Sequence, residues 1–382
     1  MNRRYVQGGQ LFVLRFRGFF GVGPAILSWL VGVQRRWHRW TSKSRILGGS
    51  LTWGQPSLWH WRGRQVLHVF LLLAALYFFV GWFRGPSGVP PTAISVAIWR
   101  DDLGTLEIME LEEYVKGVVA AEMPASFHLE ALKAQAVAAR TYAIHTMANR
   151  VSVPGYPDAV LSTDHRVDQA WMSDTALRRQ WGFLEYYWRW RRVCSAVDDT
   201  RGMVLTYEGN PILAVFHSDS GGMTEDSENY WSQWVPYLRS VPDPVDADTP
   251  YKETRLKVAR SEVRAKVRAL PDSGVALSVS THRKPNAARL MEVWERYPSG
   301  RAKVVRVGDR YFTGRAVREA LELRSTWFDV VEDGQTVEII QKGNGHGVGM
   351  SQYGADDFAR RGATYRDILL HYYSGVELTA WY

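Results

Sequence analysis

Glu122 is a carboxylate at the end of an apolar helical stripe. The stripe recurs at i, i+3, i+4, i+7 and i+8 and consists of Leu111, Tyr114, Val115, Val118 and Val119. A carboxylate that continues such a stripe is expensive unless it is paired or protonated. Burial and the negative end of the helix dipole both raise its pKa. These are the conditions that a general acid needs near neutral pH.

The next predicted helix, residues 129–148, leaves a structural alternative open. Lys133 and Arg140 are seven residues apart and share one face, so either could form a salt bridge with the glutamate. Gln135 and Tyr142 have the same spacing. They could hydrogen-bond within a site or pack in the core of this alanine-rich helix.

A second polar cluster combines His217, Ser218, Asp219 and Ser220 ahead of two glycines. Local clustering is poor evidence for a serine hydrolase, because triads assemble in space. No Gly-x-Ser-x-Gly elbow is present. Polar side chains among glycines equally suit the binding of a hydroxyl-rich ligand.

Aromatic residues follow this cluster, namely Tyr230, Trp231 and Trp234. Flat aromatic faces can stack on sugar rings, or they can simply form an aromatic core.

The densest glycine run spans Gly343–Gly354. It lacks the Gly-Lys-Ser/Thr ending of a Walker A loop. His346 is a candidate acid, base or hydrogen-bond donor, and Ser351 is a candidate helix cap. Asp164, His165 and Asp168 could bind a metal, although an isolated surface cluster of this kind is usually not a site.

The elements around these residues predict an α+β fold. Two helices break at Pro124, a hairpin turns at Gly209-Asn210, and helices follow the glycine run. Further expected elements are strands at Ala93–Ile108, loops with short helices at 151–192, a charged amphipathic helix at 251–270, and strands with one helix at 275–340.

The N-terminal region predicts a membrane anchor. Residues 1–65 contain 11 Lys/Arg and no Asp/Glu, whereas the remainder contains 36 Lys/Arg and 39 Asp/Glu. This basic tail precedes the apolar stretch 66–83, which at about 1.5 Å per residue just spans a bilayer. The positive-inside rule then makes 1–65 a cytoplasmic tail and argues against nucleic-acid binding. A buried core helix is the alternative, and Phe19–Val33 is expected to be interfacial rather than a second span.

We therefore expect residues 84–94 to be a linker and residues 95–382 an extracytoplasmic domain. The single cysteine, Cys194, excludes an intrachain disulfide and any multi-cysteine zinc site.

Three long motifs in this order resemble the stage II sporulation protein D family, which includes amidase-enhancer proteins of cell-wall turnover. They span Glu112–Ala143, Phe216–Trp231 and Gly343–Leu378. The resemblance extends from about Ser95 to the C-terminus and is loose over 251–330, which we expect to be a smaller inserted β-rich subdomain.

The resemblance implies a lytic transglycosylase that cuts peptidoglycan between N-acetylmuramic acid and N-acetylglucosamine during engulfment. The resemblance implies that the catalytic acid is the glutamate of the family's Glu-Met-Pro motif, which is Glu122 here. Lys133 and Arg140 are expected near the site. The expected sugar-binding residues are Lys133, Arg140, Tyr142, His217, Ser218, Ser220, Trp231, His346, Ser351, Gln352 and Tyr353.

Some family members bind zinc in the loop that corresponds to Thr163–Trp171, through histidine and cysteines. This chain has His165 there but no cysteine, so we expect no metal and no other cofactor. The family implies glycan strands without stem peptides as substrate, with an amidase and a membrane scaffold protein as partners. The alternative is a non-catalytic wall-binding protein that enhances an amidase.

Overall fold

The computed structural model describes residues 94–243, 249–270, 286 and 288–382. The predicted tail, Phe19–Val33, the membrane helix at 66–83 and the linker up to residue 93 lie outside the described residues. None of the helices within the described ranges combines the length and the apolar character that a bilayer span requires.

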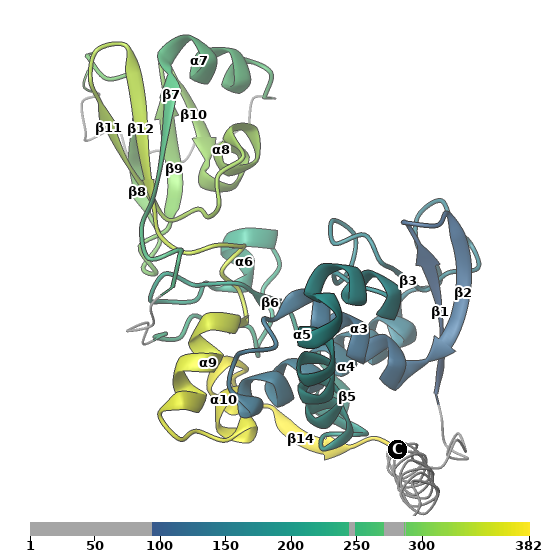
Figure 1. Ribbon diagram of the computed structural model, residues 1–382. Helices are drawn as coiled ribbons and strands as arrows, with labels where there is room; N and C mark the ends of the chain where they lie inside the picture. The colour runs from purple at the N-terminus through teal and green to yellow at the C-terminus, as the bar shows by residue number, and fades with distance from the viewer. Residues whose placement is uncertain (1–93, 244–248, 271–285, 287) are drawn as a thin grey trace, which may run out of the picture. The chain divides into compact units, whose positions relative to one another are not determined.

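The described part of the chain is a mixture of helices and several small sheets, as predicted (Figure 1). The helices are α3 (Leu111–Glu122), α4 (Leu129–Asn149), α5 (Asp174–Asp198), α6 (Ser227–Trp231), α7 (Arg260–Arg268), α8 (Gly314–Leu321), α9 (Gln352–Arg360) and α10 (Tyr365–Tyr372). The strands are β1 (Ser95–Arg100), β2 (Thr105–Glu110), β3 (Leu161–Ser162), β4 (Met203–Tyr207), β5 (Asn210–Pro211), β6 (Phe216–His217), β7 (Thr254–Ala259), β8 (Met291–Arg296), β9 (Ala302–Val307), β10 (Arg310–Thr313), β11 (Phe328–Glu332), β12 (Thr336–Gln341), β13 (Met350–Ser351) and β14 (Glu377–Ala380).

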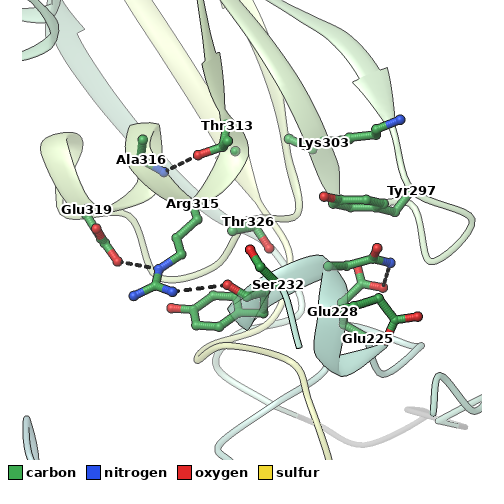
Figure 2. A pocket seen from close by; sticks show the side chains of 14 residues that line it. Glu225, Glu228, Ser232, Tyr297, Lys303, Thr313, Arg315, Ala316, Glu319 and Thr326 are labelled. Carbon is green, nitrogen blue, oxygen red and sulfur yellow. Dashed lines mark hydrogen bonds and ion pairs between the residues drawn. The ribbon is translucent and has the colours of Figure 1, made fainter. Parts of the chain in front are cut away.

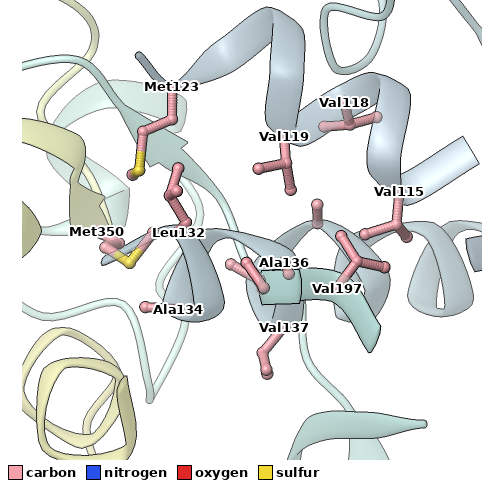
Figure 3. Packing of buried hydrophobic residues seen from close by; sticks show 14 of the residues in the cluster. Val115, Val118, Val119, Met123, Leu132, Ala134, Ala136, Val137, Val197 and Met350 are labelled. Carbon is pink, nitrogen blue, oxygen red and sulfur yellow. The ribbon is translucent and has the colours of Figure 1, made fainter. Parts of the chain in front are cut away.

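Helix α4 is the centre of the first hydrophobic core. It contacts α3, α5, α9, α10 and β4. Figure 3 shows Val115 and Val119 of α3 directed toward Ala136 and neighbouring side chains of α4. The small alanine side chains let the surrounding helices approach closely, which fixes the position of the end of α3.

Short sheets connect distant parts of the chain to this core. Strand β1 pairs antiparallel with β2 and parallel with β3. Strand β4 lies between β5 and the C-terminal strand β14. Strands β6 and β13, from two of the motifs singled out above, pair in parallel.

A second hydrophobic core is built from β7 to β12 with α7 and α8, and it includes Val258, Phe312 and Ile339. The helix expected at 251–270 is wrong in its first half. Thr254–Ala259 forms β7, which pairs antiparallel with β12, and only Arg260–Arg268 is helical. Pairing along a whole strand outweighs the local charge pattern there.

The prediction of loops with short helices at 151–192 is likewise wrong for the second half of that range. Helix α5 runs over Asp174–Asp198 and is interrupted at Gly182, which has φ 72° and ψ 168°. A glycine tolerates this left-handed backbone without a Cβ clash. The chain therefore makes a helix with a sharp break rather than several separate pieces.

Candidate active site

Glu122 is the last residue of α3. The helix ends there because Met123 is extended, with φ −125° and ψ 133°, as expected of a residue that precedes proline. The Oε1 atom of Glu122 accepts a hydrogen bond of 2.8 Å from the Ala170 N–H. Its Oε2 atom accepts a longer one, 3.3 Å, from Gln352 Nε2. The carboxyl group is therefore held by two donors from opposite parts of the sequence.

The electrostatic environment favours the protonated form of this group. Burial raises the pKa of Glu122, and the bonds from Ala170 and Gln352, together with nearby His165, offset only part of that effect. No Lys or Arg lies within ion-pair distance of Glu122 among the described residues. A part-buried carboxyl with a raised pKa and no cationic partner matches the requirement for a general acid.

The loop that provides the Ala170 N–H is fixed on both sides of that residue. Asp168 accepts hydrogen bonds from Tyr142 (2.9 Å) and Arg150 (2.7 Å). Gln169 lies over α3 and α4, where its Nε2 is 3.4 Å from the Tyr114 hydroxyl. The backbone N–H at 170 is consequently positioned by its neighbours in the loop.

Trp171, the next residue of this loop, packs directly on α3. A Cβ atom at Gly117 would lie 2.1 Å from Trp171 Nε1, so only glycine allows the ring to approach this closely. The Arg100 guanidinium covers the Trp171 ring at 4.4 Å from its centroid. The tryptophan thus connects the loop to the same helix that ends in Glu122.

Gln352 reaches Glu122 because two glycine-rich loops lie together. Asp219 and Asn344 exchange backbone hydrogen bonds of 2.9 and 2.8 Å, and β6 and β13 continue the pairing. Gly345, with φ 112°, has its α-carbon so close to His217 that a Cβ would be 2.8 Å from the histidine Cβ. Helix α9 starts directly after β13, and Gln352 is its first residue.

Gln135 of α4 completes this polar group. Its Oε1 lies 3.5 Å from Gln352 Nε2, and its own Nε2 is buried without a partner among the described residues. The two glutamines and Glu122 therefore form one connected set.

His217 and His346 lie near each other, but their ring nitrogens differ in how many hydrogen bonds they make. Both ring nitrogens of His346 are engaged, Nε2 with the Phe216 carbonyl (2.9 Å) and Nδ1 with the Val348 N–H (3.1 Å). His217 binds the Val348 carbonyl through Nδ1 at 3.1 Å, and its Nε2 is buried without a described partner. Burial, with Arg318 nearby, lowers the pKa of His346 to about 3, and burial also lowers the pKa of His217. Both rings are therefore neutral, and the engaged nitrogens of His346 argue against the acid or base role that we considered.

The serines of the motifs mostly organise the loops. Ser220 donates to Asp243 at 2.5 Å, and Ser351 caps α9 by accepting from the Gly354 N–H at 3.2 Å. Ser218 is half-buried, and its carbonyl accepts from the Tyr353 N–H at 3.0 Å.

Two aromatic residues of the predicted site lie at different distances from the surface. Trp231 is 36% exposed and lies 5.0 Å from the His346 ring. Tyr353 packs edge-on against Phe127 at 5.0 Å between ring centroids. Trp231 is thus the more open stacking surface of the two.

Arg140 and Lys133 do not lie where the resemblance places them. Arg140 is fully buried and pairs with Glu112, at the other end of α3, at 2.6 Å. Lys133 pairs with Glu130 (3.0 Å) and Asp199 (3.2 Å). Both cations are satisfied by other carboxylates, so the salt bridge to Glu122 that spacing allowed does not form. Tyr142 donates to Asp168, in the loop that provides the Ala170 N–H.

The loop that binds zinc in some family members does not fit a metal here. Asp164 forms an ion pair with Arg166 at 2.7 Å, and Asp168 forms one with Arg150. No group of three potential ligands gathers anywhere in the described ranges. The donor set therefore lacks both the cysteines and the free carboxylates that a metal would need.

A separate pocket of about 290 Å³ lies between α6 and the strands and helix of the second core (Figure 2). Neither Glu122 nor any sugar-binding residue predicted from the sequence lines it. Figure 2 shows an ion pair within its lining, between Arg315 and Glu319 at 2.8 Å. We therefore assign the candidate active site to Glu122 and not to this pocket.

Sequence reasoning missed the residues that hold the loop before Trp171. The roles of Gln169 and of the Ala170 backbone could not be read from the spacing of residues, because their partners lie on α3 and α4. Gln135 did give a signal, through its spacing of seven residues from Tyr142 in an alanine-rich helix.

Comparison with known proteins shows the family of the chain. The stage II sporulation protein family matches residues 100–207. The chain is 37% identical to stage II sporulation protein D of Bacillus subtilis (strain 168) over 297 residues, which cover 78% of this chain and 82% of that protein. It is 38% identical to stage II sporulation protein D of Bacillus amyloliquefaciens over 302 residues, which cover 78% and 83%. It is also 32% identical to the amidase enhancer of Bacillus subtilis (strain 168) over 311 residues, which cover 70% of this chain and 40% of that protein. On this similarity, the chain belongs to the stage II sporulation protein D family.

Proposed function

We propose that the chain is a membrane-anchored lytic transglycosylase that cleaves peptidoglycan glycan strands, with Glu122 as its acid and base. The observation that carries the proposal is the state of the Glu122 carboxyl. It is part-buried, its pKa is raised, and it is held by a backbone N–H and an amide rather than by a cation. Such a group can donate a proton and then stabilise the resulting carboxylate.

In the proposed reaction, protonated Glu122 transfers its proton to the glycosidic oxygen between muramic acid and glucosamine. The C–O bond breaks, and an oxocarbenium-like centre develops at C1 of muramic acid. The 6-hydroxyl of the same sugar attacks this carbon. Glu122, now a carboxylate, accepts the hydroxyl proton, and a 1,6-anhydro end results.

This mechanism needs one carboxylate, whereas most glycosidases use two. In the described residues, no Asp or Glu is among the groups that act on Glu122. The Ala170 N–H supports the mechanism further, because its bond strengthens as Glu122 becomes anionic in the transition state.

The sugar-contacting residues are part of the same proposal. Gln352 is in contact with Glu122, and Trp231 offers the partly exposed ring on which a sugar could stack. Ser218 and His217 lie on the loop that packs against the start of α9. We propose that these groups orient the muramic acid.

The decisive experiment uses glycan strands without stem peptides and the fragment from Pro90 onward. Mass spectrometry should detect anhydro-muramic ends with wild type and none with Glu122→Gln. Ser126→Ala, an exposed change in the loop just after Glu122, is the matched control and should cleave normally. Equal cleavage by Glu122→Gln would contradict the proposal.

The rival proposal is a non-catalytic protein that enhances an amidase. The 32% identity to a protein named amidase enhancer favours it. If it is right, the fragment cleaves no glycan but accelerates the release of stem peptides when an amidase is added. Glu122→Gln should then retain that stimulation.

We further propose that residues 66–83 anchor the chain in the membrane with the catalytic domain outside. A role in engulfment during endospore formation, with an amidase and a membrane scaffold protein as partners, belongs to the same proposal and is supported by family membership. Protease accessibility of the C-terminal domain in intact protoplasts, compared with lysed ones, tests the topology.

A further inference from the structure

Helix α5 exposes an unusually apolar face after its break at Gly182. Phe183 is 73% exposed, Leu184 82%, Tyr187 58% and Trp188 43%. We call these four residues the α5 aromatic face. Single exposed apolar residues are normal on protein surfaces, but a contiguous group of four marks an interaction site.

The face is continuous because of helical spacing. Its residues stand at i, i+1, i+4 and i+5, which cover one side of an α-helix. The opposite side is fixed in the first core by Tyr186, Val193, Ala196 and Val197. The helix therefore cannot rotate to bury the exposed side, and the aromatic face must be covered by something outside the described chain or remain in water.

Helix α5 also carries two exposed arginines without a carboxylate partner among the described residues, and one of them lies on the side of the face. Arg178 pairs with Asp174 and Arg189 pairs with Glu185. Arg179 and Arg191 are exposed and have no carboxylate within ion-pair distance in the described part of the chain. Arg191 lies eight residues after Phe183, so it is on the same side of the helix.

We propose that the α5 aromatic face docks on the surface of an anionic lipid bilayer. Trp, Tyr and Arg are the residues that proteins place at the boundary between headgroups and acyl chains. An exposed apolar helix face needs no complementary shape to enter this boundary, and Arg191 on the same side complements anionic headgroups.

The length of the linker supports a bilayer as the partner. This step rests on the proposed anchor at residues 66–83. Ten residues, 84–93, separate that segment from Ile94. Fully extended, they reach about 35 Å. The domain is thus always near a bilayer, and a weak surface contact gains from the high effective concentration.

The test removes the anchor, so that only the surface contact is measured. The fragment of residues 90–382, which contains every described residue, is sedimented with vesicles of phosphatidylcholine alone or mixed in equal parts with phosphatidylglycerol. Wild type should bind the anionic vesicles, bind the neutral vesicles more weakly, and lose affinity as salt rises. The double substitution Phe183→Ser and Leu184→Ser should reduce partitioning about ten-fold or more.

The matched control is Leu103→Ser with Ile108→Ser, which removes two apolar side chains that are 62% and 69% exposed elsewhere on the same core. It should bind vesicles like wild type. Absence of wild-type binding to anionic vesicles, or equal loss in both double variants, would overturn the proposal. A third outcome would also overturn it: wild type forms a dimer and binds no vesicles, whereas the Phe183/Leu184 double variant is a monomer. The face would then bind a second copy of the chain.

The vesicle assay is independent of catalysis. Both double variants should cleave soluble glycan strands at the wild-type rate. Glu122→Gln should lose cleavage and keep vesicle binding, so failure of one proposal leaves the other standing.

Discussion

Gly117→Ala is the sharpest test of how the loop before Trp171 supports Glu122. The new Cβ would lie 2.1 Å from Trp171 Nε1, whereas ordinary contact begins at 3.4 Å. The indole must therefore move by at least 1.3 Å, the difference between these two distances. Because Ala170 precedes Trp171, its N–H should move away from Glu122 Oε1, from which it is now 2.8 Å.

The expected loss follows from the strength of that bond. A hydrogen bond to a charged group contributes about 1.5–3 kcal/mol. The bond is strongest when Glu122 is a carboxylate, so its loss should lower kcat about 10- to 150-fold. The same loss removes a donor that lowers the Glu122 pKa, so the alkaline limb of kcat/KM should move to higher pH.

The assay is the rate of anhydro-muramic end formation across a pH series. Gly314→Ala is the matched control, because its Cβ would lie 1.9 Å from the Ala302 carbonyl oxygen in the second core. It should reduce stability through overpacking without moving the pH profile. A folded Gly117→Ala protein with the wild-type rate and pH profile would refute the coupling between Trp171 and Glu122.

Three further predictions concern the same region. Glu122→Gln should stabilise the protein at neutral pH and not in acid. The pKa of Glu122 is higher in the folded than in the unfolded protein, so wild type loses stability as the pH rises between these two pKa values. The loss is about 1.4 kcal/mol per unit of pKa difference. Urea unfolding at several pH values measures this, and a pH-independent difference would contradict it. Arg140→Gln should destabilise the fold by about 3–5 kcal/mol, because it leaves the buried Glu112 carboxylate unpaired; a loss of activity at unchanged unfolding midpoint would instead place Arg140 at the substrate. Dialysis against a chelator should leave cleavage intact, and activity lost and then restored by zinc would disprove the predicted absence of a metal.

The local elements of the site could be predicted because they depend on neighbours in sequence. The stripe from Leu111 to Val119 fixes which side of α3 is buried, and Pro124 fixes where it ends. The strand at 254–259 could not be predicted, because it depends on β12, some 80 residues later in the chain.

Charge pairing shows the same limit. Spacing places Arg140 on a face that meets α3, but it does not decide between Glu112 and Glu122, which lie at opposite ends of that helix. The decision comes from tertiary packing, which brings the Val197 carbonyl, the Met203 carbonyl and Glu112 around one guanidinium. The partners of Glu122 were beyond prediction for the same reason, since Ala170 contributes only its backbone.

The second donor to Glu122 also determines when the site can exist. Gln352 follows Glu122 by 230 residues. The strand β14, which closes the sheet beside β4, comes later still. During synthesis the glutamate therefore precedes both of its donors, Ala170 and Gln352. A nascent or truncated chain that ends before Gln352 carries the acid without this second donor.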